Sequence, residues 1–487
     1  MPARDAGPPH PPHGNRRPLC HQRPDVPLWR HGVTTQSFVF WSDFSLNTVA
    51  FHTLGCKVNQ YDTQAMLEKF RQAGYAVVPF SGKADVYVVN TCTVTGTGDK
   101  KSLQLTRRLR RLHPDSEIIL AGCLAQRMGE KLLETGARLI IGTQRRQEVV
   151  TLLEKAVREQ IQICAVNGLT ASTPFENLTI ADQEDHTRAI LKIQEGCNNR
   201  CTYCIIPSVR GPIRSRPMEE IRQEARRLAD AGFTELVLTG IHLSSYGKDL
   251  HDGTTLLDAI RAVQDTPGVK RIRLGSLEPT IATSEFSAGL AACDKVCPQF
   301  HLALQSGSDT VLARMARRYN TAMYLTAARN LKAAFPMAAF TTDVLTGFPG
   351  ETEEEFHQTA DFIRLIGYAK IHVFPYSPRE GTPAAVMPGQ LNNAEKERRA
   401  RELIAIGEET ARAYRESWLH KETTVLLEEE KNGLWMGYTP EYIPVTLPAC
   451  PACFSGAMVP VRLTALTEDG MTGEMIIDQN GKEDDHV

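Results

Sequence analysis

Six strand-like runs, each followed by a helical pattern, fill the middle of the chain and restrict its fold more than any other feature. Strands that alternate with helices favour parallel sheets whose faces are covered by helices. Six such units are too few to close an eight-fold barrel, so the pattern predicts a partial (β/α)6 barrel over residues 187–418. The runs are Ala189–Ile193, Glu235–Leu238, Arg271–Leu274, Phe300–Leu304, Phe340–Leu345 and Lys370–Phe374.

One helix of this region is marked at both ends. Thr352 and Glu355 form a capping box at its start, and Gly367 follows its last turn. A charged helix over Asn393–Trp418 is expected to end the barrel segment.

A second α/β pattern precedes the barrel, over residues 48–166. Strand-like runs at Val49–Leu54, Val86–Val89 and Ile118–Leu120 alternate with helical stretches, among them Asp62–Gln72, which ends at Gly74. We therefore predict an open α/β sheet here.

The other segments are predicted from composition. Residues 1–47 are crowded with Pro, His and Arg and are expected to be a disordered extension, residues 167–186 are expected to be a polar linker, and residues 481–487 a tail. Short strands separated by Gly over residues 419–480 favour a small β-barrel.

Charge and hydropathy limit the partners of the chain. The net charge is -2, so any RNA site must be a local basic patch. No apolar run reaches the roughly 20 residues that span a bilayer, and the N-terminus lacks the apolar stretch of a secretory signal. We expect a cytoplasmic protein, in which 12 cysteines suggest metal ligation more than disulfides.

Three cysteines of the first α/β segment each follow a different strand-like run: Cys56 after Thr-Leu-Gly, Cys92 after Val-Val-Asn-Thr, and Cys123 after Leu-Ala-Gly. Ligands of open α/β sheets bind beyond the carboxyl ends of the strands, so three thiols can converge there. The alternative is three ordinary buried cysteines, since free Cys is among the most buried residue types. Structural cysteines, however, should lie inside elements rather than repeatedly just past them.

A second cysteine triad, Cys197, Cys201 and Cys204, forms Cys-x3-Cys-x2-Cys after the first barrel strand. Zinc sites usually have four ligands in Cys-x2-Cys pairs, but no fourth Cys or His lies nearby in the sequence. Three thiolates on a four-iron cluster leave one iron open to a substrate. The loop therefore predicts such a cluster, with a zinc or structural role as the alternative.

The remaining cysteines are expected to be structural or incidental. Cys450 and Cys453 form a Cys-x2-Cys that would be half of a metal site, but no second pair accompanies it. The others are Cys20, Cys164, Cys293 and Cys297.

The loop at residues 195–207 resembles the cluster loop of radical S-adenosylmethionine enzymes. It reads Glu-Gly-Cys-Asn-Asn-Arg-Cys-Thr-Tyr-Cys-Ile-Ile-Pro. Leu-Gly-Cys-Lys-Val-Asn-Gln and Asn-Thr-Cys-Thr-Val-Thr make the chain similar to the methylthiotransferases of that superfamily. Phe-His-Thr-Leu-Gly-Cys-Lys-Val-Asn-Gln-Tyr and Gly-Asp-Lys-Lys-Ser most resemble the enzyme that acts on threonylcarbamoyladenosine at position 37 of tRNA. The likeness covers Val49 to Met475, with the family's C-terminal RNA-binding TRAM barrel matching weakly.

The resemblance implies cofactors and their ligands. Cys197, Cys201 and Cys204 would hold the radical [4Fe–4S] cluster, whose open iron binds S-adenosylmethionine, and Cys56, Cys92 and Cys123 would hold an auxiliary [4Fe–4S] cluster. Hydrogen-atom abstraction needs no protein general base, so no catalytic side chain is expected. Contacts to S-adenosylmethionine are expected at or after barrel strands, on the functional face of the barrel. The alternative for each position is a turn or a helix cap. These residues are Tyr203, Thr239, Gly240, Ser276, Glu278, Gln305 and Gly347.

Basic residues suggest where RNA binds. Arg210, Arg214 and Arg216 follow the cluster loop and are predicted to contact phosphates, whereas Arg107, Arg108, Arg110 and Arg111 are expected to form a solvated helix face. Glu428, Glu429 and Glu430 in the C-terminal segment argue against a strong RNA contact there.

The resemblance implies a tRNA methylthiotransferase that works as a monomer with an electron donor such as flavodoxin or ferredoxin. The alternatives are the related enzyme that acts on isopentenyladenosine, the relative that modifies a ribosomal protein, and a non-catalytic iron–sulfur RNA-binding regulator. Ser276, Glu278 and Gln305 argue against the regulator, because a sensor needs no nucleoside pocket.

Overall fold

The computed structural model describes residues 46–180, 187–449 and 453–476, which belong to one compact unit. Cys20, Cys450, the predicted N-terminal extension up to residue 45, linker residues 181–186 and the predicted tail lie outside the described residues. Among helices of the described ranges, none combines the length and the apolarity of a membrane span.

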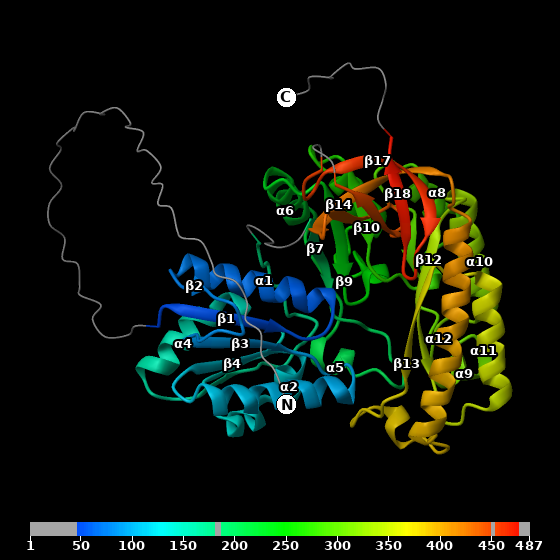
Figure 1. The fold of residues 1–487 in the computed structure, drawn as a ribbon. Helices are drawn as coiled ribbons and strands as arrows, with labels where there is room; N and C mark the ends of the chain where they lie inside the picture. The colour runs from blue at the N-terminus through cyan, green and yellow to red at the C-terminus, as the bar shows by residue number, and fades with distance from the viewer. Residues whose placement is uncertain (1–45, 181–186, 450–452, 477–487) are drawn as a thin grey trace, which may run out of the picture. The chain divides into compact units, whose positions relative to one another are not determined.

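The N-terminal sheet is parallel throughout, with the strand order β2-β1-β3-β4-β5-β6. Its central strand β3 (Val86–Thr91) is buried at every residue, as expected for a parallel strand covered on both faces. Figure 1 shows helices on both faces of this sheet. The other elements are β1 (Thr48–Thr53), α1 (Lys57–Gln72), β2 (Ala76–Val77), α2 (Gly96–Leu112), β4 (Glu117–Gly122), α3 (Cys123–Met128), β5 (Leu139–Ile141), α4 (Val149–Arg158) and β6 (Ile163–Ala165).

The parallel barrel strands follow one another in sequence order, as the repeated pattern predicts, and the short β8 pairs antiparallel with β7 at the edge. One sheet has the order β10-β9-β7-β8 and the next β11-β12-β13, and single parallel bridges at Ile272–Val296 and Leu277–Leu302 link them. The partial barrel is therefore confirmed. Its strands are β7 (Arg188–Glu195), β8 (Arg214–Ser215), β9 (Glu235–Gly240), β10 (Arg271–Leu274), β11 (Gln299–His301), β12 (Ala339–Thr346) and β13 (Lys370–Pro375).

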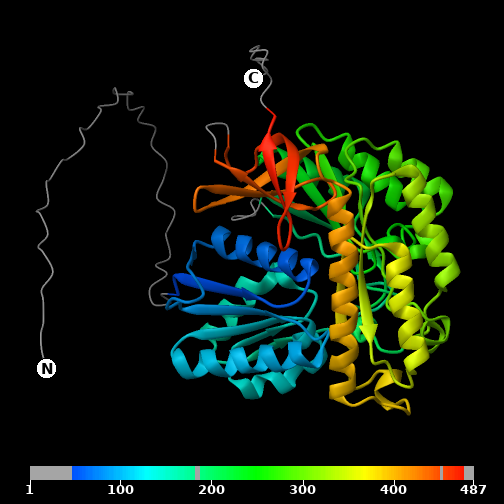
Figure 2. The same ribbon diagram turned by 45° about the vertical axis from the view of Figure 1, so that its right-hand side comes forward.

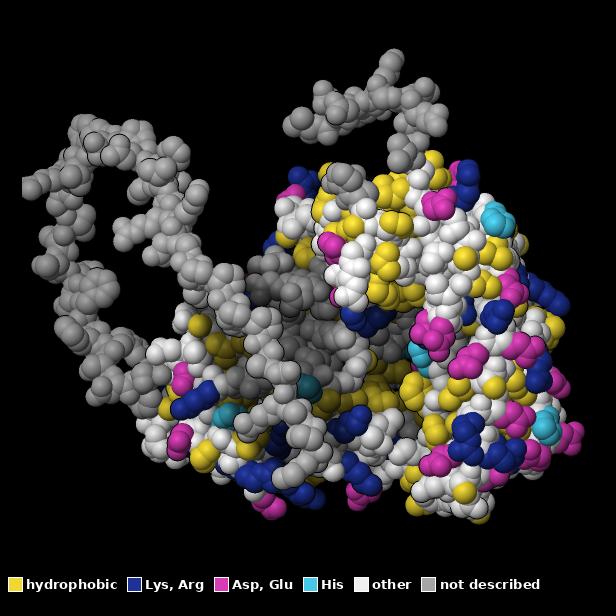
Figure 3. All heavy atoms as spheres, in the orientation of Figure 1, with side chains coloured by type: hydrophobic (Ala, Val, Ile, Leu, Met, Phe, Trp, Pro, Cys, Tyr) yellow, Lys and Arg dark blue, Asp and Glu magenta, His cyan; other side chains and the backbone are white. Residues whose placement is uncertain are grey.

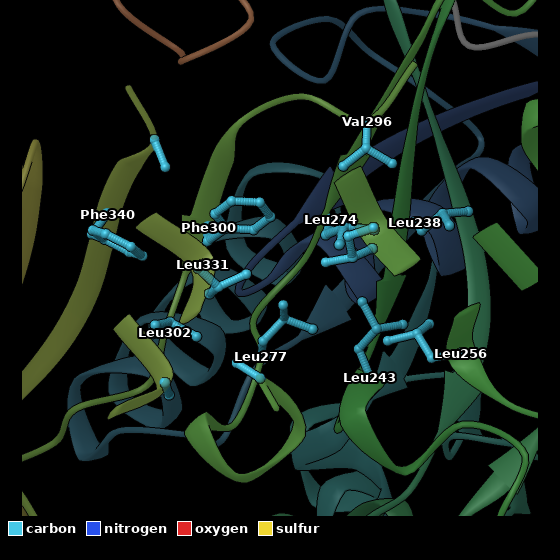
Figure 4. Packing of buried hydrophobic residues seen from close by; sticks show 14 of the residues in the cluster. Leu238, Leu243, Leu256, Leu274, Leu277, Val296, Phe300, Leu302, Leu331 and Phe340 are labelled. Carbon is cyan, nitrogen blue, oxygen red and sulfur yellow. The ribbon is translucent and has the colours of Figure 1, made fainter. Parts of the chain in front are cut away.

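Helices pack against the outside of these strands and create the largest core, whose leucines and phenylalanines interdigitate in Figure 4. In α11 the predicted capping box of Thr352 and Glu355 is present, and Gly367 adopts the left-handed conformation. The barrel helices are α5 (Ile206–Arg210), α6 (Met218–Asp230), α7 (Leu256–Gln264), α8 (Ser284–Ala291), α9 (Asp309–Arg314), α10 (Thr321–Ala334), α11 (Glu353–Ile366) and α12 (Asn393–Glu416).

A closed five-stranded barrel follows α12, as Figure 2 shows at the red end of the chain. Arginines of the large barrel hold it: Arg271 donates to the carbonyl oxygens of Thr424 and Tyr438, and Arg273 donates to that of Pro440. Its strands are β14 (Glu422–Lys431), β15 (Leu434–Tyr438), β16 (Pro444–Pro448), β17 (Met458–Leu466) and β18 (Met471–Met475).

The predicted linker packs against the protein where it is described. Leu178 and Ile180 are buried against Tyr61, whose hydroxyl donates to the Leu178 carbonyl at 2.6 Å. This segment is polar in overall composition, but two buried apolar side chains hold it against the protein.

Candidate functional site

The first cysteine triad lies at the carboxyl ends of three adjacent strands. Cys56 precedes α1, Cys92 follows β3, and Cys123 opens α3 after β4. The strand order reverses between β1 and β3, which is the switch point where sheets of this kind bind ligands. At Gly55, which has a φ of +105°, an added Cβ would lie 3.0 Å from the Cys92 sulfur. The Cys56 turn therefore packs directly against Cys92.

Arg210 of α5 is a cationic neighbour of these thiols. Its Nε donates to the Cys123 sulfur at 3.2 Å. Burial nevertheless raises the pKa of Cys123 to about 11, and burial also raises the pKa of Cys92. Without metal Cys92 and Cys123 are thus protonated, and the Arg210 charge would stabilise their thiolates once metal binds.

The second triad lies in the loop after β7. Contacts on both sides hold this loop in place. Gly196 has a φ of +71°, and a Cβ there would collide with the Pro212 carbonyl oxygen. The Cys197 N–H donates to the Gly211 carbonyl at 3.0 Å, and the Thr202 N–H donates to the Met315 carbonyl at 3.1 Å. The loop is therefore held in place by the barrel itself.

An arginine also donates a hydrogen bond to this triad. Arg317 donates from Nη1 to the Cys201 sulfur at 3.2 Å, and the Asn199 N–H donates to the Cys197 sulfur at 3.4 Å. Burial raises the pKa of Cys204 to about 12. Each triad thus offers soft sulfur donors beside one guanidinium, a donor set that fits an iron–sulfur cluster. Within the described residues no group of three His, Cys, Asp or Glu side chains is placed to hold a single metal ion.

Glu278 is joined to this loop. Its carboxylate accepts from Asn199 Nδ2 at 3.2 Å and lies 3.1 Å from His242 Nε2 and 3.3 Å from Arg317 Nη2. Burial raises the pKa of Glu278, but the hydrogen bond from His242 and the charge of Arg317 outweigh burial and lower it. Glu278 is therefore an oriented carboxylate beside the loop.

Of the other residues predicted to contact the cofactor, two touch each other and two lie at the end of β9. Tyr203 donates to Gln305 Oε1 at 3.0 Å, so these two side chains meet. Thr239 is buried and Gly240 packs against Gln194, both at the carboxyl end of β9.

Two further predicted contacts lie just after strands. Ser276 is exposed after β10. The Gly347 N–H donates to Glu351 Oε2 at 2.7 Å, so that amide is already used by the turn.

Sequence reasoning did not identify Asn199, His242 and Arg317 as members of this site. Asn199 lies between two of the loop cysteines, which could have marked it. His242 and Arg317 come from separate barrel loops, and no motif in the sequence marks either residue.

The prediction that Arg210, Arg214 and Arg216 contact RNA phosphates is corrected by the structure. They are 0%, 2% and 1% exposed. Arg210 donates to Asp62, Glu195 and Asn59. Arg216 donates to Glu224 and to the Tyr61 hydroxyl, and Arg214 to the Pro212 carbonyl. These three arginines therefore bond to groups inside the protein and not to RNA phosphates.

Arg210 belongs to a buried ionic network between the N-terminal sheet and the barrel. Asp62 of α1 lies 2.8 Å from Lys192 Nζ and 3.0 Å from Arg210 Nη1, and it also pairs with Arg146. Glu195 lies 3.1 Å from Arg210 Nη1 and also pairs with Lys192. Because Glu195 directly precedes the Gly196 turn into Cys197, Arg210 connects the surroundings of both triads.

The basic face of α2 remains at the surface. Arg107, Arg108 and Arg111 are exposed, while Arg110 donates to the carbonyls of Pro114 and Ser116. Of the other cysteines, Cys293 and Cys297 are buried, and Cys164 and Cys453 are partly buried.

Family comparisons divide the chain at the same two regions. Residues 48–142 match the Uncharacterized protein family UPF0004, and residues 191–363 match the Radical SAM superfamily. The "structure of radical S-adenosylmethionine methyltransferase, TsrM, from Kitasatospora setae" shares the fold, with a TM-score of 0.53 at 14% identity over 70% of this chain and 77% of that chain.

Full-length relatives are more similar. The threonylcarbamoyladenosine tRNA methylthiotransferase MtaB of Bacillus subtilis is 43% identical over 82% of this chain and 90% of that protein. MtaB of Thermotoga maritima is 32% identical over 88% and 96%. The tRNA-2-methylthio-N(6)-dimethylallyladenosine synthase of Symbiobacterium thermophilum is 34% identical over 88% and 94%.

Proposed function

Since the chain belongs to the radical S-adenosylmethionine methylthiotransferase family, we propose that it converts N6-threonylcarbamoyladenosine at position 37 of tRNA to the 2-methylthio derivative. The observation that carries the proposal is the pair of cysteine triads, one at the switch point of the N-terminal sheet and one in the β7 loop, with Arg210 reaching from one region to the other. The higher identity to the Bacillus subtilis MtaB favours the threonylcarbamoyl substrate over the dimethylallyl one.

The enzyme's cofactors are S-adenosylmethionine and [4Fe–4S] clusters. We assign Cys197, Cys201 and Cys204 to the radical cluster and Cys56, Cys92 and Cys123 to the auxiliary cluster. When bound, these groups supply electron transfer, hydrogen-atom abstraction and the methylthio group.

The protein's own side chains would stabilise the cysteine thiolates and orient the bound S-adenosylmethionine. Arg210 and Arg317 donate to one sulfur of each triad and favour its thiolate form. Glu278 is fixed by Asn199, His242 and Arg317 as an acceptor for a ribose hydroxyl of S-adenosylmethionine. The Tyr203–Gln305 pair, with Thr239, Gly240, Ser276 and Gly347, borders the same end of the barrel.

The reaction implies partners. We propose that the protein works in the cytoplasm as a monomer, with tRNA as its substrate and flavodoxin or ferredoxin as its electron donor.

The test is an anaerobic assay with reconstituted protein, S-adenosylmethionine, a reductant and two tRNA pools that carry threonylcarbamoyladenosine or isopentenyladenosine. Nucleoside mass spectrometry should find the methylthio product in the first pool only, and the Cys197→Ala variant should give none. Product in the isopentenyladenosine pool alone would establish the alternative substrate. 5′-Deoxyadenosine release without either product would refute the proposal.

A further inference from the structure

All exposed charged residues of α2 are cations, namely Lys100, Lys101, Arg107, Arg108 and Arg111. Within the described ranges, these side chains form no ion pair and no side-chain hydrogen bond. Figure 3 shows dark blue side chains along the lower edge of the view, where Figure 1 labels α2. We call this surface the basic face of α2.

Other charged helices of the protein neutralise their arginines. In α12, Arg399 lies 2.7 Å from Glu395, and in α6, Arg226 lies 3.1 Å from Asp230. Opposite charges one turn apart stabilise an exposed helix face, whereas like charges at the same spacing destabilise it. The basic face of α2 therefore lacks the charge arrangement expected of a face that only meets water.

The positions of the cations do not serve the helix itself. Arg107 and Arg111 are like charges at the i,i+4 spacing. The helix dipole favours cations at the last turn, which accounts for Arg111. Lys100 and Lys101 lie near the start of the helix, where the dipole gives a cation no benefit. An anion that binds this face would therefore relieve repulsion that the folded chain otherwise carries.

A groove of about 440 Å³ lies beside the basic face, between α2 and the 3₁₀ helix η1 (Gly129–Thr135). With a rise of about 1.5 Å per residue, the stripe from Lys100 to Arg111 is about 16 Å long. A groove with a cationic wall of this length fits a phosphate backbone better than a single small anion. Its charged lining residues are Arg107, Arg110, Arg111, Lys131 and Glu134.

Contacts to the barrel fix the start of α2 beside the N-terminal triad. The helix begins at Gly96, four residues after Cys92. Arg379, which follows β13, donates to Asp99 Oδ2 at 2.6 Å, and the Gly96 N–H donates to Ser377 Oγ at 3.2 Å. The basic face therefore leads away from the proposed cluster site in a fixed direction.

Other regions of the chain offer less to RNA phosphates. Because the net charge is -2, RNA must bind at a local basic patch. Arg210, Arg214 and Arg216 are buried, and the C-terminal barrel exposes Glu429 and Glu430. The unpaired cations of α2 supply such a patch next to the proposed site.

We propose that the basic face of α2 binds the phosphate backbone of the tRNA anticodon arm while the target nucleotide lies at the cluster site, an inference that rests on the proposed function. Phosphate contacts fix the register and orientation of a nucleic acid without reading its sequence. The face therefore holds the anticodon arms of different tRNAs alike.

The salt dependence of binding tests this without turnover. A fluorescent anticodon stem-loop that carries threonylcarbamoyladenosine is titrated with cluster-loaded protein at a series of salt concentrations, in the absence of S-adenosylmethionine. In Arg107→Gln/Arg108→Gln/Arg111→Gln the log–log slope should be shallower by about 2, because each phosphate contact contributes roughly 0.7–0.9. That difference is about tenfold in affinity for each threefold change in salt.

The matched control is Arg226→Gln/Arg364→Gln/Arg412→Gln. It removes the same charge from exposed arginines that pair with carboxylates on α6, α11 and α12, and it should leave the slope unchanged. Circular dichroism and iron content show whether each variant retains its fold and clusters. Should the α2 variant lose them, Lys100→Gln/Lys101→Gln should still make the slope shallower by about 1.5.

An unchanged slope in the folded α2 variants, or equal flattening in the control, would overturn the inference. An unchanged slope together with slower reduction by flavodoxin would also overturn it, because the face would then belong to a protein partner. Failure of the proposed function would instead appear as absence of methylthio product from wild-type protein that still binds the stem-loop with a steep slope.

Discussion

Asp62→Asn tests whether the buried ionic network holds the N-terminal sheet to the barrel. Asp62 is 1% exposed and pairs with Arg146, Lys192 and Arg210. These three cations are balanced by three carboxylates, Asp62, Glu195 and Glu176. Asparagine keeps the shape and removes one charge, so the network is left with one excess buried cation.

Breaking a buried pair by removing one partner costs about 3–5 kcal/mol. We expect Asp62→Asn to lower the free energy of unfolding by about that amount in urea denaturation of the apoprotein followed by circular dichroism. The control is Asp230→Asn, whose partner Arg226 lies 3.1 Å away at the surface, where a pair contributes about 0–1 kcal/mol. Equal small losses in both variants would refute the stabilising role of the network.

The pH dependence has a definite sign. Burial raises the pKa of Asp62, but the charges of Arg146, Lys192 and Arg210 outweigh burial and lower it. A carboxyl whose pKa is lowered in the folded state contributes stability above its unfolded pKa of about 4 and loses it as the pH falls. Wild-type protein should therefore lose stability below about pH 5 more steeply than Asp62→Asn.

Three further outcomes are expected. Reconstituted protein should hold about eight irons, and the Cys197/Cys201/Cys204→Ala variant about four by iron assay, since two four-iron clusters are proposed; loss of all iron, or of none, would contradict two separate sites. Arg214→Ala/Arg216→Ala should lower the melting temperature but leave the salt dependence of tRNA binding unchanged, because both side chains are buried; a flatter log–log slope would restore the phosphate contacts. Thr352→Ala should remove the capping box of α11 and cost about 1 kcal/mol in urea denaturation, whereas an unchanged midpoint would show that the cap is dispensable.

The elements with local patterns were predictable. The β3 run is apolar and bounded by turn residues, and the α11 caps are encoded within a few positions. Boundaries shifted where tertiary contacts decide: α1 begins at Lys57 instead of Asp62, because Cys56 and the buried Val58 already belong to its first turn. In the same way β11 ends at His301 rather than at Leu304.

The position of the triad cysteines just after strands was predictable because it is a local feature, whereas the partners of an arginine side chain are not local. Arg210 and Asp62 are 148 positions apart, and a run of basic residues looks the same whether it faces RNA or a buried carboxylate. Arg317 was missed for the same reason, since its sulfur partner Cys201 lies 116 positions earlier.

The hydrogen bond from Arg210 to Cys123 also bears on the order of folding and metal insertion during synthesis. The two residues lie 87 positions apart, so during synthesis all three N-terminal cysteines leave the ribosome well before Arg210. Until β7 and α5 have folded against the sheet, Cys123 is without the cation that favours its thiolate. Insertion of iron at the proposed N-terminal cluster site is therefore expected to follow completion of the barrel, and an isolated N-terminal fragment should acquire metal poorly.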